Sequence, residues 1–158
     1  VERLLIALLA EGPVETRSVA ARALGQLHDE RALEPLCAAM GDSTAAVRTA
    51  ATEALGDLGD ARGLEALLEA LRGNDAALRA TAARALGRLR NRGALEPLKA
   101  ALTDGSHDVQ CAAAAGLGLL GDRRAVVALQ SALITIDPSV RVALVDALAQ
   151  LGVPVKFI

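Results

Sequence analysis

One column of polar residues recurs at a constant interval along this chain of 158 residues. Its members are four arginines and one glutamine: Arg17, Arg48, Arg79, Gln110 and Arg141. A guanidinium group presents several N–H donors in a fixed plane, which suits it to carboxylates and carbonyl oxygens held in one geometry. The spacing therefore predicts a structural arginine ladder that bonds to the turns and weakens at Gln110. An anion-binding site is the alternative interpretation.

A second group of arginines is clustered in one short segment: Arg84, Arg88, Arg90 and Arg92. Arg84 and Arg88 are four residues apart and share one face of a helix, whereas Arg90 and Arg92 fall in the following turn. With Arg79 nearby, these arginines could receive an acidic peptide or a phosphorylated partner. Duplex nucleic acid would need more phosphate contacts along its groove, and acidic neighbours oppose it, so a protein partner is preferred.

Residues capable of catalysis or metal binding do not cluster in the sequence. His28 and His107 fall in different turns, and Cys37 and Cys111 form a widely spaced pair. A zinc site needs several His or Cys at ligand spacing, and a nucleophile needs a nearby base. The glycines form no phosphate-binding loop. We therefore expect no metal, no cofactor and no enzymatic activity, and the two cysteines favour a reducing, cytoplasmic setting.

Composition excludes several classes of protein. Hydrophobic residues make up 53% of the chain, with 35 alanines and 28 leucines, yet it contains no Trp, no Tyr and a single Phe. Ala and Leu favour helices, whereas sheets draw on aromatic and β-branched residues, so an all-α fold is predicted. A net charge of −2 offers nucleic acid or an anionic membrane no general attraction. No apolar run reaches the length of a membrane span.

A 31-residue repeat organises the whole chain. Its clearest markers are four glycines and one alanine at the same register: Gly25, Gly56, Gly87, Gly118 and Ala149. The preceding residues recur as Ala-Leu or Gly-Leu in the first four repeats, and no insertion breaks the register. The repeats cover approximately residues 1–30, 31–61, 62–92, 93–123 and 124–152, followed by a tail over 153–158. We therefore expect a single repeat domain over residues 1–158.

Each repeat is predicted to form two antiparallel helices. In the repeat over 62–92, Leu64, Leu67 and Leu71 follow the spacing of one helical face, which indicates a helix over about 62–71. Residues 73–75 then end that helix and cap a second one over about 76–89. Because one helix pair cannot bury its apolar face alone, the pairs must stack, and abundant Ala and Gly allow close approach. The predicted fold is a right-handed α-solenoid of five helix pairs.

The repeat unit resembles that of a known family. Its pattern is Val47-Arg48-x-Ala50-Ala51-x-x-Ala54-Leu55-Gly56-x-Leu58-Gly59-Asp60 followed by Leu64-Glu65-x-Leu67. This pattern resembles the HEAT repeat and is most similar to the short variety of phycobilisome-lyase-like proteins. The resemblance covers nearly the whole chain and implies five HEAT-like antiparallel pairs. Members of this superfamily include scaffolds, chromophore lyase subunits, metal-dependent hydroxylases and DNA glycosylases, so the fold alone selects no function.

In HEAT-like folds the second helices line the concave surface, and the resemblance places the partner there. We expect a partner to contact the positions at which the repeat changes: Arg84, Arg88, Cys111, Ala115, Leu119, Val142, Val145 and Asp146. The fourth repeat loses its charges on this face, which indicates a contact surface, with tighter packing near the end of the array as the alternative. Glu53 and Asp57 lie between arginines of neighbouring repeats, where exposed ion pairs are the simplest interpretation.

These features favour a non-catalytic scaffold that binds a protein or peptide on its concave face. An accessory subunit or domain of an enzyme, such as a phycobilin lyase-type protein, is the alternative that the resemblance implies, and nucleic-acid binding is a third hypothesis. The first ten residues lack the polar outer face of a capping repeat, so we expect a fragment of a larger protein with further domains. The apolar tail over 153–158 either folds back over the last pair or continues.

Overall fold

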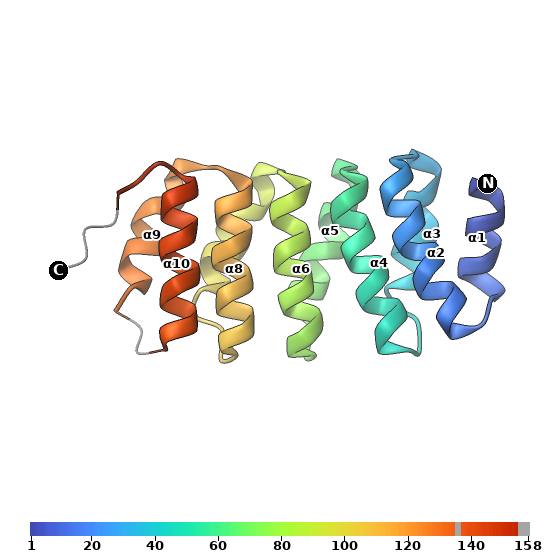
Figure 1. Ribbon diagram of the computed structural model, residues 1–158, viewed down its shortest axis with the longest axis horizontal. Helices are drawn as coiled ribbons and strands as arrows, with labels where there is room; N and C mark the ends of the chain where they lie inside the picture. The colour runs from blue at the N-terminus through green and yellow to red at the C-terminus, as the bar shows by residue number, and fades with distance from the viewer. Residues whose placement is uncertain (135–136, 155–158) are drawn as a thin grey trace.

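The computed structural model describes residues 1–134 and 137–154. Within these residues ten α-helices form five antiparallel pairs, and there is no strand. The pairs are α1 (Glu2–Glu11) with α2 (Val14–Leu27), α3 (Leu33–Ala39) with α4 (Ala45–Leu58), α5 (Leu64–Leu71) with α6 (Ala76–Leu89), α7 (Leu95–Ala101) with α8 (His107–Leu120), and α9 (Val126–Ala132) with α10 (Pro138–Gln150). Their succession along one axis (Figure 1) confirms the predicted right-handed α-solenoid.

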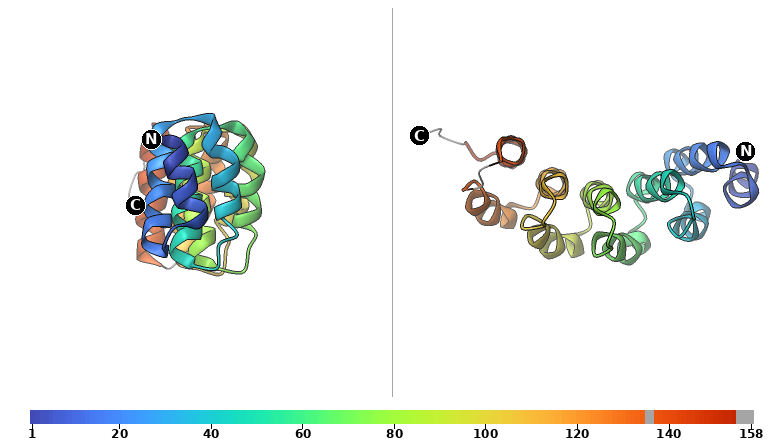
Figure 2. Two further views of the ribbon diagram at one scale, coloured as in Figure 1. Left: turned by 90° about the vertical axis from the view of Figure 1, so that its right-hand side faces the viewer. Right: turned by 90° about the horizontal axis from the view of Figure 1, so that it is seen from below.

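The helices are arranged in two curved layers. Figure 2 shows, in its right-hand view, the second helices α2, α4, α6, α8 and α10 along the inner side of the curve, with α3, α5, α7 and α9 outside them. The second helices therefore line the concave face, as the family resemblance implied. The sequence left two alternatives for the tail over 153–158, and most of that tail lies outside the described residues.

Short polar side chains set the helix ends. The Asp75 carboxylate accepts hydrogen bonds from the backbone N–H groups of the first turn of α6 and caps that helix. Asp60 accepts a hydrogen bond from the backbone N–H of Arg62 and begins a 3₁₀ turn over Ala61–Gly63. The helix expected from about residue 62 therefore begins at Leu64, because the tighter turn takes up the residues before it.

Two columns of leucines form the core between the layers. The second helices contribute one column, in which each side chain is at most 1% exposed: Leu24, Leu55, Leu86, Leu117 and Leu148. The first helices contribute the other, in which each is fully buried: Leu36, Leu67, Leu98 and Leu129. Because each column recurs once per repeat, every helix pair buries the same apolar stripe against its neighbours.

Glycine marks the closest approach of neighbouring second helices. A Cβ atom added to Gly56 would lie 2.7 Å from the Cα of Ala85, and one added to Gly25 would lie equally close to the Cα of Ala54. Side chains do not come this close to backbone atoms, so these positions of α4 and α2 require glycine. The contact confirms that the Ala and Gly content serves helix stacking.

Candidate partner-binding surfaces

Two arginines of the ladder clamp consecutive repeats together. Arg17 on α2 donates to both carboxylate oxygens of Asp42, at 3.0 and 3.1 Å, and also to a carbonyl oxygen at the end of α1. Arg79 on α6 donates in the same way to Asp104, at 2.9 and 3.0 Å, and to carbonyl oxygens of the turn before its helix. The Arg79 hydrogen bond holds the pKa of Asp104 below its ordinary value. These arginines serve structure, since each bridges two adjacent turns.

The second arginine of the ladder, Arg48, lacks this clamp. Arg48 donates to two carbonyl oxygens of its own turn, at 2.9 and 3.1 Å, but its guanidinium lies 3.8 Å from the Asp75 carboxylate. Gly73 occupies the register at which the two clamps have Asp42 and Asp104. Along the first three junctions between repeats, the carboxylate contact of the ladder is therefore strong, weak and strong again.

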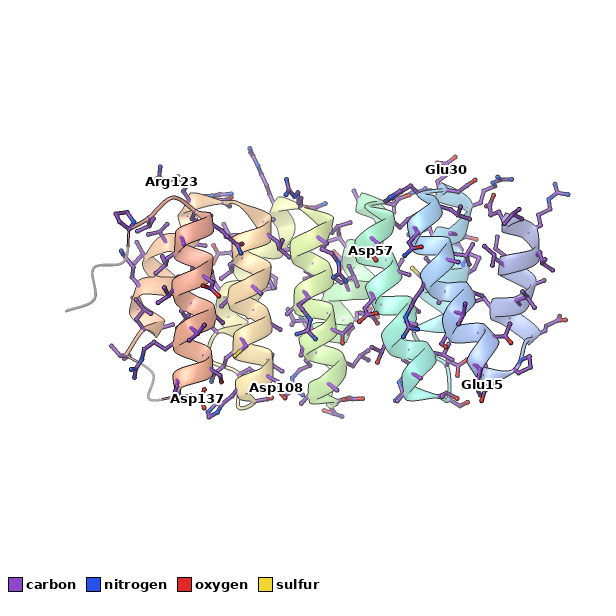
Figure 3. All side chains as sticks on the ribbon, in the orientation of Figure 1. Glu15, Glu30, Asp57, Asp108, Arg123 and Asp137 are labelled. Atoms are coloured by element: carbon purple, nitrogen blue, oxygen red, sulfur yellow. The ribbon has the colours of Figure 1, made fainter. Side chains whose placement is uncertain are left out.

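A different pair occupies the junction with the last repeat. Gln110 donates to the carbonyl oxygen of Asp104 at 2.6 Å, which reproduces the contact with its own turn. His107 Nδ1 lies 2.8 Å from Asp137 Oδ2 across the junction, and Figure 3 shows Asp137 beside the start of α8. Arg141, the last member of the ladder, lies on α10 and lines a depression on that helix.

Ion pairs cross the charged half of the concave face. Arg88 Nε lies 2.9 Å from Asp57 Oδ1, and Arg22 Nε lies 4.0 Å from Glu53 Oε2. Figure 3 shows Asp57 on this face, near the middle of the array. Arg84 has no hydrogen bond or ion pair within the described residues. The exposed pairs contribute little to stability, because water and salt screen them.

The concave face of α8 is uncharged and partly apolar. Leu119 is 36% exposed, and Cys111 and Ala115 are half-buried. Cys111 Sγ lies 4.0 Å from Ser139 Oγ on the next second helix. Ala114 is fully buried between helices, as is the same register of the earlier repeats. A contact surface on α8 stays a prediction.

The predicted residues of α10 lie at the end of the described array. Val142, Val145 and Asp146 line a depression of about 430 Å³ together with Pro138 and Arg141. The register of Val145 is fully buried in each earlier repeat, at Ala21, Thr52, Ala83 and Ala114. Val145 therefore occupies the face that the other second helices bury against their successors. It belongs to a stacking face, whereas Val142 and Asp146 share the registers of Cys111 and Ala115 and border the concave face.

A basic hollow lies on the edge of the array at which the second helices end. It has a volume of about 390 Å³, and the turns after α6 and after α8 supply the four arginines that line it: Arg90, Arg92, Arg123 and Arg124. We call this site the arginine hollow. Sequence reasoning identified Arg90 and Arg92 but missed the other two. The repeat register, which places Arg123 one repeat after Arg92, was the signal that could have found them.

The two histidines lie at separate places in the fold. No group of three or more His, Cys, Asp or Glu side chains is placed to hold a metal ion in the part of the chain that the structure describes. His28 follows α2, where its Nδ1 lies 3.5 Å from the carbonyl oxygen of Leu58, whereas His107 begins α8. None of the described helices is long and apolar enough to cross a membrane.

The chain belongs to the HEAT repeat family. The model of HEAT repeats matches residues 1–77 and 64–149, which together cover almost the whole solenoid. Comparison with curated proteins found no match.

Several solved structures share this fold. The complex of CpcE and CpcF of phycocyanin lyase from Nostoc sp. PCC7120 is similar with 26% identity and a TM-score of 0.80, over 96% of this chain and 65% of that chain. A designed armadillo repeat protein in complex with the peptide (KR)4 has 20% identity and a TM-score of 0.69, over 93% and 80%. The archaeal HEAT-like repeats protein from Thermococcus onnurineus NA1 has 19% identity and a TM-score of 0.55, over 96% and 65%. This chain thus spans less than two thirds of the phycocyanin lyase chain.

Proposed function

We propose that this chain is a non-catalytic scaffold that binds a protein or a peptide on its concave face. The observation that carries the proposal is the change of chemistry along that face. Charges on α4 are paired with α2 and α6, whereas Arg84 has no partner within the described residues and α8 presents Leu119. An unpaired cation on one helix and an exposed apolar side chain on the next form a surface that a partner can cover and neutralise.

The designed armadillo repeat protein supports this proposal, because it holds a peptide on a solenoid of the same architecture. The peptide in that complex is basic, whereas the face between α6 and α8 here combines a cation with an apolar patch. A segment with an acidic side chain beside an apolar one would match Arg84 and Leu119.

The experiment compares Leu119→Glu on the concave face with Val127→Glu on α9, in the outer layer, where Val127 is 72% exposed. A partner is first identified by pull-down and mass spectrometry, and its affinity is then measured with purified proteins. We expect Leu119→Glu and Arg84→Glu each to weaken binding about tenfold or more, as central contact residues do, with no effect of Val127→Glu. Unchanged affinity in both concave variants would refute the concave site.

An accessory subunit or domain of an enzyme, such as a phycobilin lyase-type protein, is the second candidate. It is supported by the similarity to the CpcE and CpcF complex of phycocyanin lyase. Incubation with a bilin and an acceptor phycobiliprotein tests it, alone and with any partner that the pull-down identifies. Absence of a spectral change in both mixtures would remove this candidate.

The scaffold proposal includes a cytoplasmic location and no cofactor, nucleic acid or membrane as ligand. Cys37 and Cys111 are free thiols, which a reducing compartment preserves. The net charge of −2 provides no general attraction for polyanions. Retention on DNA that falls steeply with salt would contradict this part of the proposal.

A further inference from the structure

The arginine hollow brings together residues that are far apart in the chain. Arg90 and Arg92 come from the turn after α6, and Arg123 and Arg124 come from the corresponding turn after α8. Figure 3 shows Arg123 at the edge of the array at which these helices end. Stacking of successive helix pairs therefore creates a site that neither turn has alone.

One arginine of the hollow is neutralised by an aspartate that also lines it. Arg124 donates to both oxygens of Asp122, at 2.6 and 3.0 Å, and these hydrogen bonds lower the pKa of Asp122 to about 2. Glu96 lies near Arg124, but its carboxylate is bonded to Lys99 at 3.0 Å. The acidic groups around the hollow are therefore engaged by these two cations.

The other three arginines keep their hydrogen-bond donors available. Arg92 is attracted to the Asp122 carboxylate at longer range, which adds to the lowering of that pKa. The side chains of Arg90, Arg92 and Arg123 have no hydrogen bond or ion pair within the described residues. Three guanidinium groups can thus donate to an anion that enters the hollow.

The fold itself does not require this charge, as the matching hollow between the turns after α2 and after α4 shows. That hollow has a volume of about 350 Å³, and its charged lining is balanced: Glu30, Arg31, Glu34 and Arg62. Glu30 stands at the register of Arg92, and Ala61 stands at the register of Arg123. Two hollows with the same framework therefore differ in charge.

We propose that the arginine hollow binds an acidic peptide segment of a partner protein through its carboxylate or phosphate groups. Guanidinium groups bind both anions through paired N–H···O hydrogen bonds, and a hollow of this size holds one or two such groups. A polynucleotide would need positive charge along several phosphates, but the matching hollow on the same edge has a balanced charge and the whole chain carries a charge of −2. The site lies at the turn edge and does not depend on the concave face.

The test uses short fluorescent peptides in anisotropy titrations with the full chain. The peptides are polyglutamate, a phosphoserine peptide and polyglutamine, and a single-stranded oligonucleotide of matched charge serves as a fourth probe. We expect at least one anionic peptide to bind and polyglutamine not to bind. The relative affinity of the first two peptides shows whether carboxylate or phosphate is preferred. We expect the oligonucleotide to bind more weakly than the better peptide.

Two triple variants with the same change of net charge separate a site from general attraction. Arg90→Gln, Arg92→Gln and Arg123→Gln together empty the hollow of its available guanidinium groups, and binding should fall about tenfold or more. Arg3→Gln, Arg62→Gln and Arg72→Gln together should leave binding within about twofold. None of these residues lines the arginine hollow, so the variant changes only the screened long-range attraction between the chain and the peptide. Circular dichroism verifies that both variants remain helical. Arg123→Gln alone should give an intermediate loss of peptide affinity.

Three results would overturn the proposal. The first is no binding of either anionic peptide to the wild-type chain at physiological salt. The second is an equal loss of binding in both triple variants, which would show general charge attraction. The third is tighter binding of the oligonucleotide than of either peptide with loss in the first triple variant, which would assign the hollow to nucleic acid. None of these results depends on Leu119 or Arg84, so the concave-face proposal is tested separately.

Discussion

At the scale of single residues, the arginine ladder shows how one side chain joins two repeats. Arg79 donates to a carboxylate of the next repeat and to carbonyl oxygens of its own turn, whereas Arg48 has the carbonyl contacts and a distant carboxylate. Gln110 resembles Arg48, since its amide donates to the carbonyl oxygen of Asp104 in its own turn at 2.6 Å. A bidentate, charge-assisted contact is stronger than one to a neutral oxygen.

We therefore predict that Arg79→Gln lowers the free energy of unfolding more than Arg48→Gln does. Both variants lose one charge and can keep a carbonyl contact, but the first also leaves Asp104 without its bidentate partner. Chemical denaturation of the two variants, measured side by side, provides the comparison. Equal destabilisation would mean that the Asp104 clamp contributes nothing beyond the contacts with the turn.

The same clamp makes stability depend on acid. The Arg79 hydrogen bond lowers the pKa of Asp104 in the folded state from its ordinary value of 3.8. The stabilising contribution is therefore complete only at pH values well above 3.8 and is lost as the pH falls through the lowered pKa. In Asp104→Asn this part of the acid sensitivity should be absent. Urea denaturation at a series of acidic pH values tests this, and parallel curves for wild type and variant would contradict it.

At the scale of helices, the glycines determine how closely the second helices stack. Gly56→Ala places a Cβ atom 2.7 Å from Ala85 Cα, so α4 and α6 must move apart. We expect a loss of about 1–3 kcal/mol of stability from this overpacking, although alanine favours an isolated helix. Thermal or chemical unfolding measures the change. Gly105→Ala is the control, because no atom lies within 4 Å of its added Cβ, and it should be nearly neutral.

Helix ends also place functional side chains. Arg90 ends α6 in the left-handed conformation with a φ of 53°, as His28 ends α2 with a φ of 51°, whereas Gly59 and Gly121 end α4 and α8. An L-residue is less stable than glycine in this conformation. The turn after α6 therefore carries a guanidinium group at a position where helix termination alone would favour glycine.

At the scale of the whole molecule, the solenoid is a linear array in which each repeat contacts its neighbours. Leu86 is fully buried in the middle of the array, and Leu86→Ala should cost about 2–5 kcal/mol as a core truncation. We expect amide hydrogen exchange to accelerate most in α6 and in α4 and α8, which pack against it, and less in α1. Equal acceleration in all helices would show that the array unfolds as one cooperative unit.

The sequence alone determined the helix pairs, their order and their stacking. The leucine columns and the glycine register recur once in every repeat, and such periodicity is a property of the chain that folding preserves. The same periodicity also predicted that Arg84 and Leu119 lie on the concave face. The start of α5 was less predictable, because a 3₁₀ turn competes with the first residues of a helix.

Only the tertiary structure decided which residues of different repeats meet. It paired Arg79 with Asp104 but left Arg48 distant from a carboxylate, and it assigned Val145 to the stacking face at the end of the described array. It also brought Arg90 and Arg92 into one hollow with Arg123 and Arg124 of the turn after α8. These contacts depend on the path of each turn and on the rotation between helix pairs, which arise from packing and are not encoded in the spacing of residues along the chain.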